Sequence, residues 1–415
     1  MTRCTGTARR RHSRWVAAAA TLGMLLAACS PSAEESEGET SVDDLDLQRE
    51  PQSANEELPP AEGEGLWLPY QIEQLALVTP PWPATAAQEL GGVFVAPQER
   101  DGALDFRAVD DQGNELWWAQ RPASCTGFVL TTTRAGQDIA VLADLQGTAE
   151  TIATTVSAYD LSTGERAWGP VEVPGPHRGP GLVYAQMPAT FGEPEGALAL
   201  DADTGHVLEL SEQSHVVGEY DGTVLVTDDT RLSALEPADD GAQAARWRLP
   251  LEERGWAAED VAAVAGADPG SDVALLDVAA DGHVLVDLAN GDVLAEGVRE
   301  ALTDDATGAR VVLDADGLHG IDPDGEPSWS APASAGAQLQ GAGGALVYLL
   351  DDGAVRVHNT LTGDPATAYD AQGSGEIAVP ELIAPTGAML LTAGEASVLA
   401  TTEPGEHADV DDGDR

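Results

Sequence analysis

The sequence predicts an all-β chain built from repeated four-stranded units, and two observations predict it. A strand–turn–strand pattern, typified by VSAYDLSTGERAW at residues 156–168, occurs seven times along the chain. The turn glycines of its first and last copies, Gly113 and Gly363, are separated by six intervals of about 42 residues, the length of a four-stranded propeller blade. Residues 66–402 hold about eight such lengths. We therefore predict a β-propeller over 66–402, with eight blades and seven as the alternative.

Each copy has an apolar or alternating run, then Asp or Asn, then a turn containing Gly, then a second short strand. The Asp or Asn side chain can hydrogen-bond the turn backbone, and Gly supplies the positive φ of a tight hairpin turn. The copies are FRAVDDQGNELWW (106–118), VSAYDLSTGERAW (156–168), LALDADTGHVLEL (198–210), LSALEPADDGAQAARW (232–247), VLVDLANGDVLAE (284–296), LHGIDPDGEPSWS (318–330) and VRVHNTLTGDPATAY (355–369). The expected turn residues are Asp110, Gly113, Asp160, Gly164, Asp201, Gly205, Asp287, Gly291, Asp322, Gly325, Asn359 and Gly363, with Glu236 replacing Asp in the fourth copy.

Four copies end their second strand in tryptophan, at Trp117, Trp168, Trp247 and Trp329. A large flat side chain that recurs at one position is expected to pack against the neighbouring repeat. Apolar runs between the copies, such as 91–97 and 344–352, predict the remaining strands, and a short helical turn is expected near 251–263. A strand from 65–79 is expected to complete the last blade and close the ring.

The first 28 residues have the features of an export signal. Residues 1–14 contain five Arg and no acid, and residues 15–28 are apolar but too few for a comfortable membrane span. The sequence Leu26-Ala27-Ala28-Cys29 resembles the lipobox of bacterial lipoproteins. That resemblance implies cleavage before Cys29 and lipid attachment to its sulfur, so we predict a lipid-anchored protein on the extracytoplasmic face of the cell membrane. An ordinary signal peptide or a helical anchor is the alternative.

Two acidic segments flank the predicted propeller. Residues 29–65 and 403–415 contain few large apolar side chains and many carboxylates, so neither can bury enough surface to form a core. We predict that 29–65 is a disordered tether and that 403–415 is a disordered tail.

Charge excludes nucleic acid as a partner, and the cysteine content excludes an internal disulfide. The chain has 71 acidic and 20 basic residues and a formal net charge of −51. Nucleic acid is excluded as a partner, because phosphate binding needs basic surface. Once the signal and Cys29 are set aside, Cys125 alone remains, so no internal disulfide can form and Cys125 is expected to be a small buried side chain.

The intact stretch A-x-D-x-x-T-G-x-x-x-W at 158–168 resembles the repeat of pyrroloquinoline-quinone-like β-propellers, and partial forms recur at 108–117, 199–208 and 320–329. The resemblance implies a propeller fold more strongly than a function. This superfamily includes quinone-dependent alcohol dehydrogenases, an outer-membrane assembly lipoprotein that scaffolds barrel insertion, and exported actinobacterial lipoproteins.

A dehydrogenase of this type is expected, by the resemblance, to have adjacent cysteines over its quinone, calcium-ligating Glu and Asn, and an Asp base. The sequence has no Cys-Cys pair, no H-E-x-x-H, no G-x-S-x-G and no P-loop. The Asp- and Gly-rich stretch 314–326 lacks the order of a calcium loop and is interpreted as two turns. We therefore predict no catalytic, cofactor-binding or metal-binding residues.

The leading hypothesis is a non-catalytic, membrane-anchored scaffold that binds another envelope protein or a small ligand. Two alternatives remain open. One is a degenerate quinone- or metal-dependent dehydrogenase. The other is an envelope-assembly lipoprotein resembling the barrel-assembly propeller.

Overall fold

The computed structural model of the chain describes residues 47–148, 151–187, 196–211, 213–237, 243–264, 271–278 and 282–405. These residues form β-strands numbered β1 to β32, together with the 3-10 helices η2 (Ala84–Ala86), η3 (Glu252–Arg254) and η4 (Ala258–Asp260). The last two occupy the short helical turn expected near 251–263. The all-β prediction is confirmed. Across the described ranges, no helix combines the length and apolarity needed to cross a bilayer.

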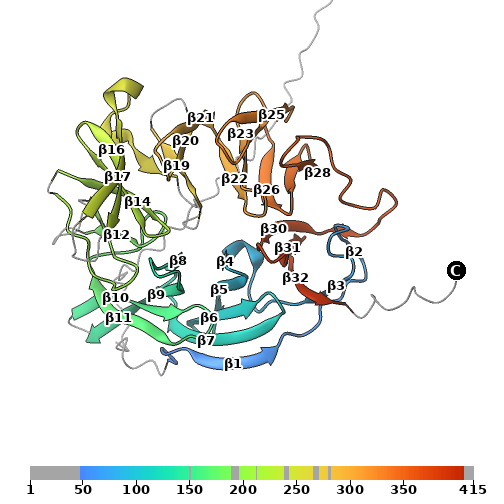
Figure 1. The fold of residues 1–415 in the computed structure, drawn as a ribbon. Coiled ribbons are helices and arrows are strands. Elements are labelled where there is room, and N and C mark those ends of the chain that lie inside the picture. The colour runs from blue at the N-terminus through green and yellow to red at the C-terminus, as the bar shows by residue number, and fades with distance from the viewer. Residues whose placement is uncertain are drawn as a thin grey trace, which may run out of the picture.

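Most strands belong to antiparallel sheets that stand side by side around a ring, as Figure 1 shows. Sheet 1 contains β4 (Gln88–Leu90), β5 (Val93–Arg100), β6 (Ala103–Asp110) and β7 (Asn114–Pro122), and sheet 2 contains β8 (Phe128–Thr132), β9 (Asp138–Thr148), β10 (Thr151–Asp160) and β11 (Arg166–Val173). Sheet 3 contains β12 (Val183–Gln186) and β13 (Gly196–Ala199). Sheet 4 contains β14 (His215–Tyr220), β15 (Thr223–Asp228), β16 (Arg231–Pro237) and β17 (Gln243–Pro250). Sheet 5 contains β18 (Ala262–Ala263), β19 (Val273–Asp277), β20 (His283–Asp287) and β21 (Val293–Val298), and sheet 6 contains β22 (Glu300–Asp304), β23 (Ala309–Leu313), β24 (Leu318–Ile321) and β25 (Pro327–Ala331). Sheet 7 contains β26 (Gln338–Gly343), β27 (Leu346–Asp351) and β28 (Ala354–Asn359). Sheet 8 contains β30 (Val379–Ile383), β31 (Met389–Ala393) and β32 (Ala396–Pro404).

The predicted propeller of four-stranded blades is confirmed. Within the described residues, seven of the sheets have at least three strands, and sheet 3 has the β12–β13 pair. Isolated bridges, His177 to Tyr184 and Leu200 to Val207, extend sheet 3 on both sides. The prolines of the segment PGPHRGP (174–180) lack N–H groups and cannot sustain a regular ladder, which explains why this unit is reduced. Among the described strands, the propeller therefore has seven blades of three or more strands, which is the alternative count, and the predicted count of eight is wrong because sheet 3 is reduced to a pair.

The ring is closed by a strand from the N-terminal side of the domain. β3 (Leu75–Val78) precedes sheet 1 in the sequence but pairs antiparallel with β32 of sheet 8, placing Leu77 opposite Ala400 and Val78 opposite Leu399. Figure 1 shows blue β3 beside red β32. The expected closure by a strand from 65–79 is therefore present.

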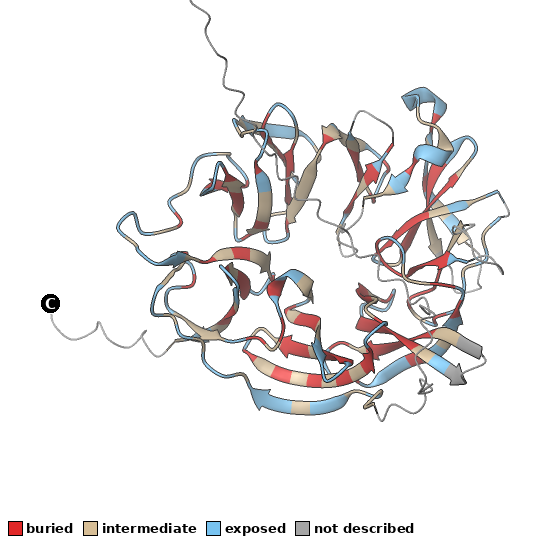
Figure 2. Cartoon of the chain, turned by 180° about the vertical axis from the view of Figure 1, so that it is seen from behind, coloured by how far each residue is buried: buried red, intermediate tan, exposed pale blue. Residues whose placement is uncertain are grey.

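The predicted boundary of the tether is wrong. Within the segment 29–65, β1 (Gln52–Glu57) pairs antiparallel with β7, placing Ser53 opposite Trp117 and Glu57 opposite Asn114. An acidic segment cannot build its own core, but its backbone can still add to an open sheet edge. Figure 2 shows β1 as a largely exposed strand outside the buried strands of sheet 1. Residues 29–46 lie outside the described residues.

Side chains also fasten the segment around β1 to the propeller. Arg121, only 1% exposed, donates from Nη1 to the carbonyl oxygen of Arg49 (2.6 Å) and from Nη2 to the Tyr159 hydroxyl (3.2 Å). Arg49 in turn forms an ion pair with Asp144 of sheet 2. We call residues 48–57 the N-terminal strap, because they lie across the outer edges of sheets 1 and 2. At the other end, β32 continues to Pro404, two residues past the predicted boundary, and residues 406–415 lie outside the described residues.

Each repeat tryptophan contacts the turn of the next sheet. The indole Nε1 of Trp168 donates to the carbonyl oxygen of Ala202 at 2.8 Å. Trp117, Trp247 and Trp329 donate likewise to Leu161, Leu288 and Thr360, each at 2.8 Å. In every case the acceptor directly follows the Asp or Asn of the repeat. Sheet 3 receives this contact like a full blade.

The tryptophan rings also explain why the turns need glycine. A Cβ added to Gly205 would lie 2.4 Å from Cε3 of Trp168, and Gly205 has a φ of +70°. A side chain at that position would therefore meet both a clash and a disfavoured backbone conformation.

Candidate binding face and its polar pocket

The repeat turns gather on one edge of the ring. In a four-stranded antiparallel sheet, the turn between the first and second strands and the turn between the third and fourth strands lie at the same end of the strands. This edge therefore carries the repeat turns together with first turns such as Asp221–Gly222, which joins β14 to β15. We call this edge the turn face.

The repeat Asp and Asn side chains close the turns in which they lie. Oδ1 of Asp287 accepts hydrogen bonds from the N–H groups of Ala289 (2.7 Å) and Asn290 (3.3 Å). The same arrangement is found at Asp110, Asp160, Asp201, Asp322 and Asn359. The glycines have positive φ at Gly113, Gly164, Gly205, Gly291, Gly325 and Gly363. Residues 238–242 of the fourth copy's turn lie outside the described residues.

The pKa of Asp160 shows that the hydrogen bonds of the turn hold this carboxylate in its ionised form. Partial burial acts to raise the pKa, but hydrogen bonds from Gln137, Ser162 and Thr163 lower it to about 2. A carboxylate held so firmly in its ionised form serves its turn rather than proton transfer near neutral pH. The repeat therefore places structural carboxylates on the turn face.

A pocket of about 450 Å³ opens on the turn face between sheets 4 and 5. Its lining mixes both signs of charge: Arg134, Arg246, Arg310, Asp221, Glu236, Asp272 and Asp287. The three arginines come from three different sheets, sheets 2, 4 and 6. We call this cavity the turn-face pocket.

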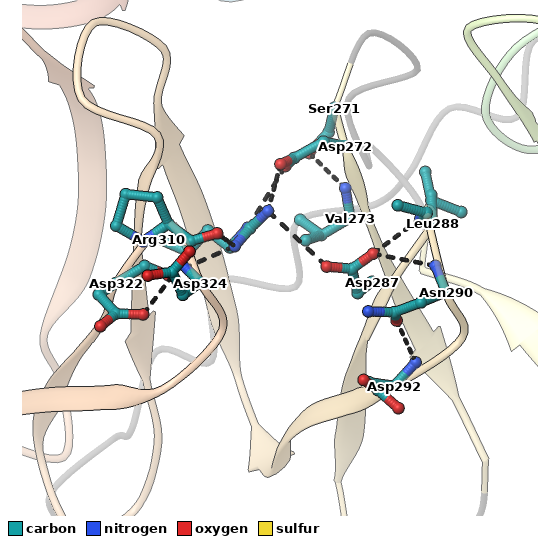
Figure 3. Close-up of polar contacts among 12 residues, drawn as sticks. Ser271, Asp272, Val273, Asp287, Leu288, Asn290, Asp292, Arg310, Asp322 and Asp324 are labelled. Carbon is teal, nitrogen blue, oxygen red and sulfur yellow. Dashed lines mark hydrogen bonds and ion pairs between the residues drawn. The ribbon is translucent and has the colours of Figure 1, made fainter.

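Arg310 forms the wall between sheets 5 and 6, as Figure 3 shows. It is only 5% exposed, and its guanidinium pairs with Asp272 and lies 3.9 Å from Oδ2 of Asp287. Its Nη1 also donates to the carbonyl oxygens of Asp322 and Pro323, each at 3.4 Å. A buried guanidinium is stable only with such partners. Arg310 therefore ties the repeat turn of sheet 5 to that of sheet 6.

The other two arginines are paired as well. Arg246 forms an ion pair with Glu236 at 2.7 Å, and Arg134 reaches Asp201 at 3.6 Å and pairs with Asp203. Because Arg246 and Glu236 have side chains that are 41% and 44% exposed, they can exchange this contact for one with a bound molecule. The pocket can thus accept a ligand that carries both a carboxylate and a positively charged group.

A buried carboxylate, Glu219, holds the turn at Gly222, which lines the turn-face pocket. Glu219, 1% exposed, accepts hydrogen bonds from the N–H groups of Gly222 (2.6 Å) and Leu182 (2.8 Å). Burial raises the pKa of Glu219 to about 7, although both backbone donors act to lower it. Burial and the Glu219 carboxylate also raise the pKa of Tyr184. Glu219 therefore joins sheets 3 and 4 and gains charge near neutral pH.

This placement predicts that Glu219 stabilises the propeller more at pH 5 than at pH 8. The folded pKa of Glu219, about 7, lies above its unfolded value of 4.5. The folded state therefore holds the proton more tightly, and the stabilisation is full below pH 4.5 and is lost as the pH rises through 7. The shift corresponds to about 3 kcal/mol of unfolding free energy. Thermal unfolding of the wild type and Glu219→Gln between pH 5 and pH 8 measures it.

The Glu219→Gln substitution removes the titrating group, so the melting temperature of this variant should change less with pH than that of the wild type. As a control, Asp228→Asn removes a half-buried carboxylate whose partial burial acts to raise its pKa but whose hydrogen bonds with Thr230 and Arg231 lower it. This control should leave the slope between pH 5 and pH 8 unchanged. Equal slopes for all three proteins would contradict the assignment to Glu219.

Sequence reasoning missed both Arg310 and Glu219. A charged residue inside an otherwise apolar strand was the available signal, in ARVVL (309–313) for Arg310 and in HVVGEY (215–220) for Glu219. The signal marks a buried charge, but not its partners. Some of those partners, such as Asp272 for Arg310 and Leu182 for Glu219, come from other sheets at sequence separations that local patterns do not encode.

The remaining candidates for chemistry are placed as follows. In the part of the chain that the structure describes, no group of three or more His, Cys, Asp or Glu side chains could hold a metal ion. In the Asp-rich stretch 314–326, Asp314 accepts from the N–H groups of Asp316 and Gly317, and Asp322 closes the following turn. These are the two turns expected from the sequence. Cys125 is fully buried.

Comparisons with known proteins give the following similarities. No protein-family model and no curated protein sequence matches the chain. BamB from Moraxella catarrhalis is similar with a TM-score of 0.40 and 14% identity, over 79% of this chain and 98% of that chain. The computationally designed Ika8 protein has a TM-score of 0.39 and 15% identity, over 81% and 99%. For a streptogramin B lyase the TM-score is 0.35 and the identity 13%, over 79% and 98%. Similarity at this level does not assign a function to the chain.

Proposed function

We propose that the chain is a lipid-anchored protein of the extracytoplasmic membrane face, and that its propeller binds another envelope protein through the turn face. The observation that carries the proposal is the turn-face pocket, where three arginines and four carboxylates from separate sheets surround about 450 Å³. Exposed, exchangeable ion pairs give specificity to protein contacts. The intact repeat at 158–168 supports placing the chain with pyrroloquinoline-quinone-like propeller lipoproteins.

A charge-reversal experiment tests the binding role. The full-length exported protein, cross-linked in intact cells and purified from membranes, is compared with the Arg246→Glu variant. We expect the variant to lose the cross-linked partner, because like charges then face Glu236 and the bound segment. Arg254→Glu is the matched control, since Arg254 pairs with Glu296 at 3.7 Å and is similarly exposed. No partner above background with the wild type, or equal recovery from both variants, would reject the proposal.

The non-catalytic part of the proposal has its own test. The repeat carboxylates and glycines are engaged in turns, which supports a scaffold over an enzyme. Titration of the purified protein with pyrroloquinoline quinone and Ca²⁺ should leave its absorption spectrum and melting temperature unchanged beyond the effect of ionic strength. A saturable change in either would favour the dehydrogenase alternative.

The anchoring part of the proposal predicts the effect of Cys29→Ala. The motivation is the sequence Leu26-Ala27-Ala28-Cys29, which lies outside the described residues. Without the thiol that accepts the lipid, the chain should leave the membrane fraction or accumulate as an unprocessed precursor. Fractionation and metabolic labelling with a fatty acid measure this. The buried Cys125→Ala variant is the control and should remain labelled and bound to membranes.

A further inference from the structure

Sheet 7 ends in an unpaired edge. It contains β26, β27 and β28, whereas the adjoining sheets 6 and 8 have four strands each. The chain after β28 bonds to that edge at one bridge, where Ala366 donates its N–H to the carbonyl of Val357 (2.8 Å) and Asn359 donates to Asp364 (2.9 Å). Beyond Ala366 the chain leaves β28, and Ala368 accepts from the N–H of Tyr70 instead.

The departure of the chain leaves backbone groups of β28 open. The backbone N–H and C=O groups of Val357 and Asn359 point away from β27. Because these groups alternate in direction along a strand, those of Val355, two residues before Val357, also point away from β27. Among the described residues, the N–H and C=O of Val355 and the N–H of Val357 have no hydrogen-bond partner. An extended segment of three or four residues is long enough to pair with these groups.

A groove of about 660 Å³ lies beside this edge. Its walls are β28, the end of β25 with the residue that follows it (330–332), and the departing segment 365–369. Figure 1 shows β25 and β28 in neighbouring sheets, as this lining requires. The open backbone groups and the groove coincide, so the space corresponds to the place of a fourth strand in sheet 7. We call it the β28 groove.

The charge of the β28 groove differs from that of the whole chain. Its described lining contains Arg356 and no Asp or Glu, although the chain has 71 acidic residues. Arg356 is 47% exposed and uses Nη1 for Asp351 at 2.9 Å, which leaves other guanidinium N–H groups available. An acidic side chain on the bound segment is therefore complementary to this surface.

We propose that the β28 groove binds an extended, acid-bearing segment of a partner protein, which pairs with β28 as the fourth strand of sheet 7. Backbone hydrogen bonds supply affinity in strand addition, and alternate side chains supply specificity. This inference rests on the proposed role in protein binding, but it concerns a surface separate from the turn-face pocket.

The probes are three peptides added to the full-length exported protein in detergent. The first is acetyl-Thr-Val-Asp-Val-Thr-amide, the second has Lys in place of Asp, and the third carries N-methyl groups that block one backbone edge of the first. Fluorescence anisotropy measures binding. We expect the Asp peptide to bind at least tenfold more tightly than the other two. Equal binding of the Asp and Lys peptides, or no binding of any peptide, would overturn the proposal.

Two variants locate the binding. Val355→Pro removes the outward N–H without removing a bond to β27, so it should abolish binding of the Asp peptide. Arg356→Gln should bring the affinities for the Asp and Lys peptides within about twofold of each other. Arg231→Gln is the matched control, because Arg231 is 48% exposed and pairs with Asp228 at 3.1 Å in sheet 4. Circular-dichroism melts confirm that each variant is folded.

Other occupants of the groove would give different results. Dimerisation that Val355→Pro abolishes would replace the partner by a second copy of this chain. Peptide binding that appears only after deletion of residues 406–415 would replace it by the protein's own acidic tail. Loss of the cross-linked partner in Arg246→Glu, with no peptide binding at β28, would reject the groove alone and leave the proposed function intact.

Discussion

Removing residues 66–79 is expected to open the ring and make the protein aggregate. The deletion takes away β3, which covers the outer edge of β32, and exposed sheet edges promote association. It also removes Ile72, which is fully buried, and Leu75 and Leu77, which pack against the same core. Full burial of a side chain such as Ile72 is worth about 1.5–3 kcal/mol, and the two half-buried leucines add to this, so the combined loss is a large part of the stability of a typical domain.

The measurement is the soluble fraction and the melting temperature of the exported protein. The matched control deletes residues 30–46, which precede the N-terminal strap, and it should melt like the wild type. A deletion of 66–79 that stays soluble and melts with the control would show that β3 does not close the ring.

Trp168→Ala is expected to destabilise the propeller by about 3–5 kcal/mol. Trp168 is 8% exposed and donates its indole N–H to the carbonyl of Ala202 at 2.8 Å, so the substitution removes both a packed ring and a hydrogen bond between sheets 2 and 3. Trp168→Phe keeps part of the packing and loses the donor, so its effect should be intermediate. Chemical denaturation monitored by circular dichroism gives the unfolding free energies.

The control for this substitution is Leu361→Ala, because Leu361 is 47% exposed and the change should cost less than about 0.5 kcal/mol. A double-mutant cycle with Gly205→Ala sharpens the test. A methyl group at Gly205 would clash with the Trp168 ring, so Gly205→Ala should cost less when residue 168 is already Ala. Additive effects would show that the two positions do not touch.

The sequence was sufficient to predict the repeat and the way it is built. Asp and Gly at fixed places in a turn act locally, and their hydrogen bonds form within four residues, as at Asp287 and Gly291. The tryptophan contacts were also predictable in kind, because they recur once per repeat. The ring closure by β3 agrees with the strand expected from 65–79.

The pocket and the strap were not predictable in the same way. Arg310 meets Asp272, 38 residues away, and Arg121 meets Arg49, 72 residues away. Neither contact leaves a periodic trace. Composition predicts a tether over the strap because it reports only whether a segment can form its own core, and β1 needs none when it adds to β7.

The N-terminal strap would have a mechanical consequence for a chain anchored at Cys29 as proposed above. Force applied through the chain before residue 48 reaches β1 and the Arg49–Asp144 pair before it reaches β3. The strand that closes the ring is therefore shielded from tension until the strap has been pulled away. About eighteen residues, 30–47, would then separate the proposed anchor at Cys29 from the strap, a span of at most about 65 Å when fully extended. Detachment of the strap would lengthen the chain segment between the proposed anchor and the propeller without opening the ring.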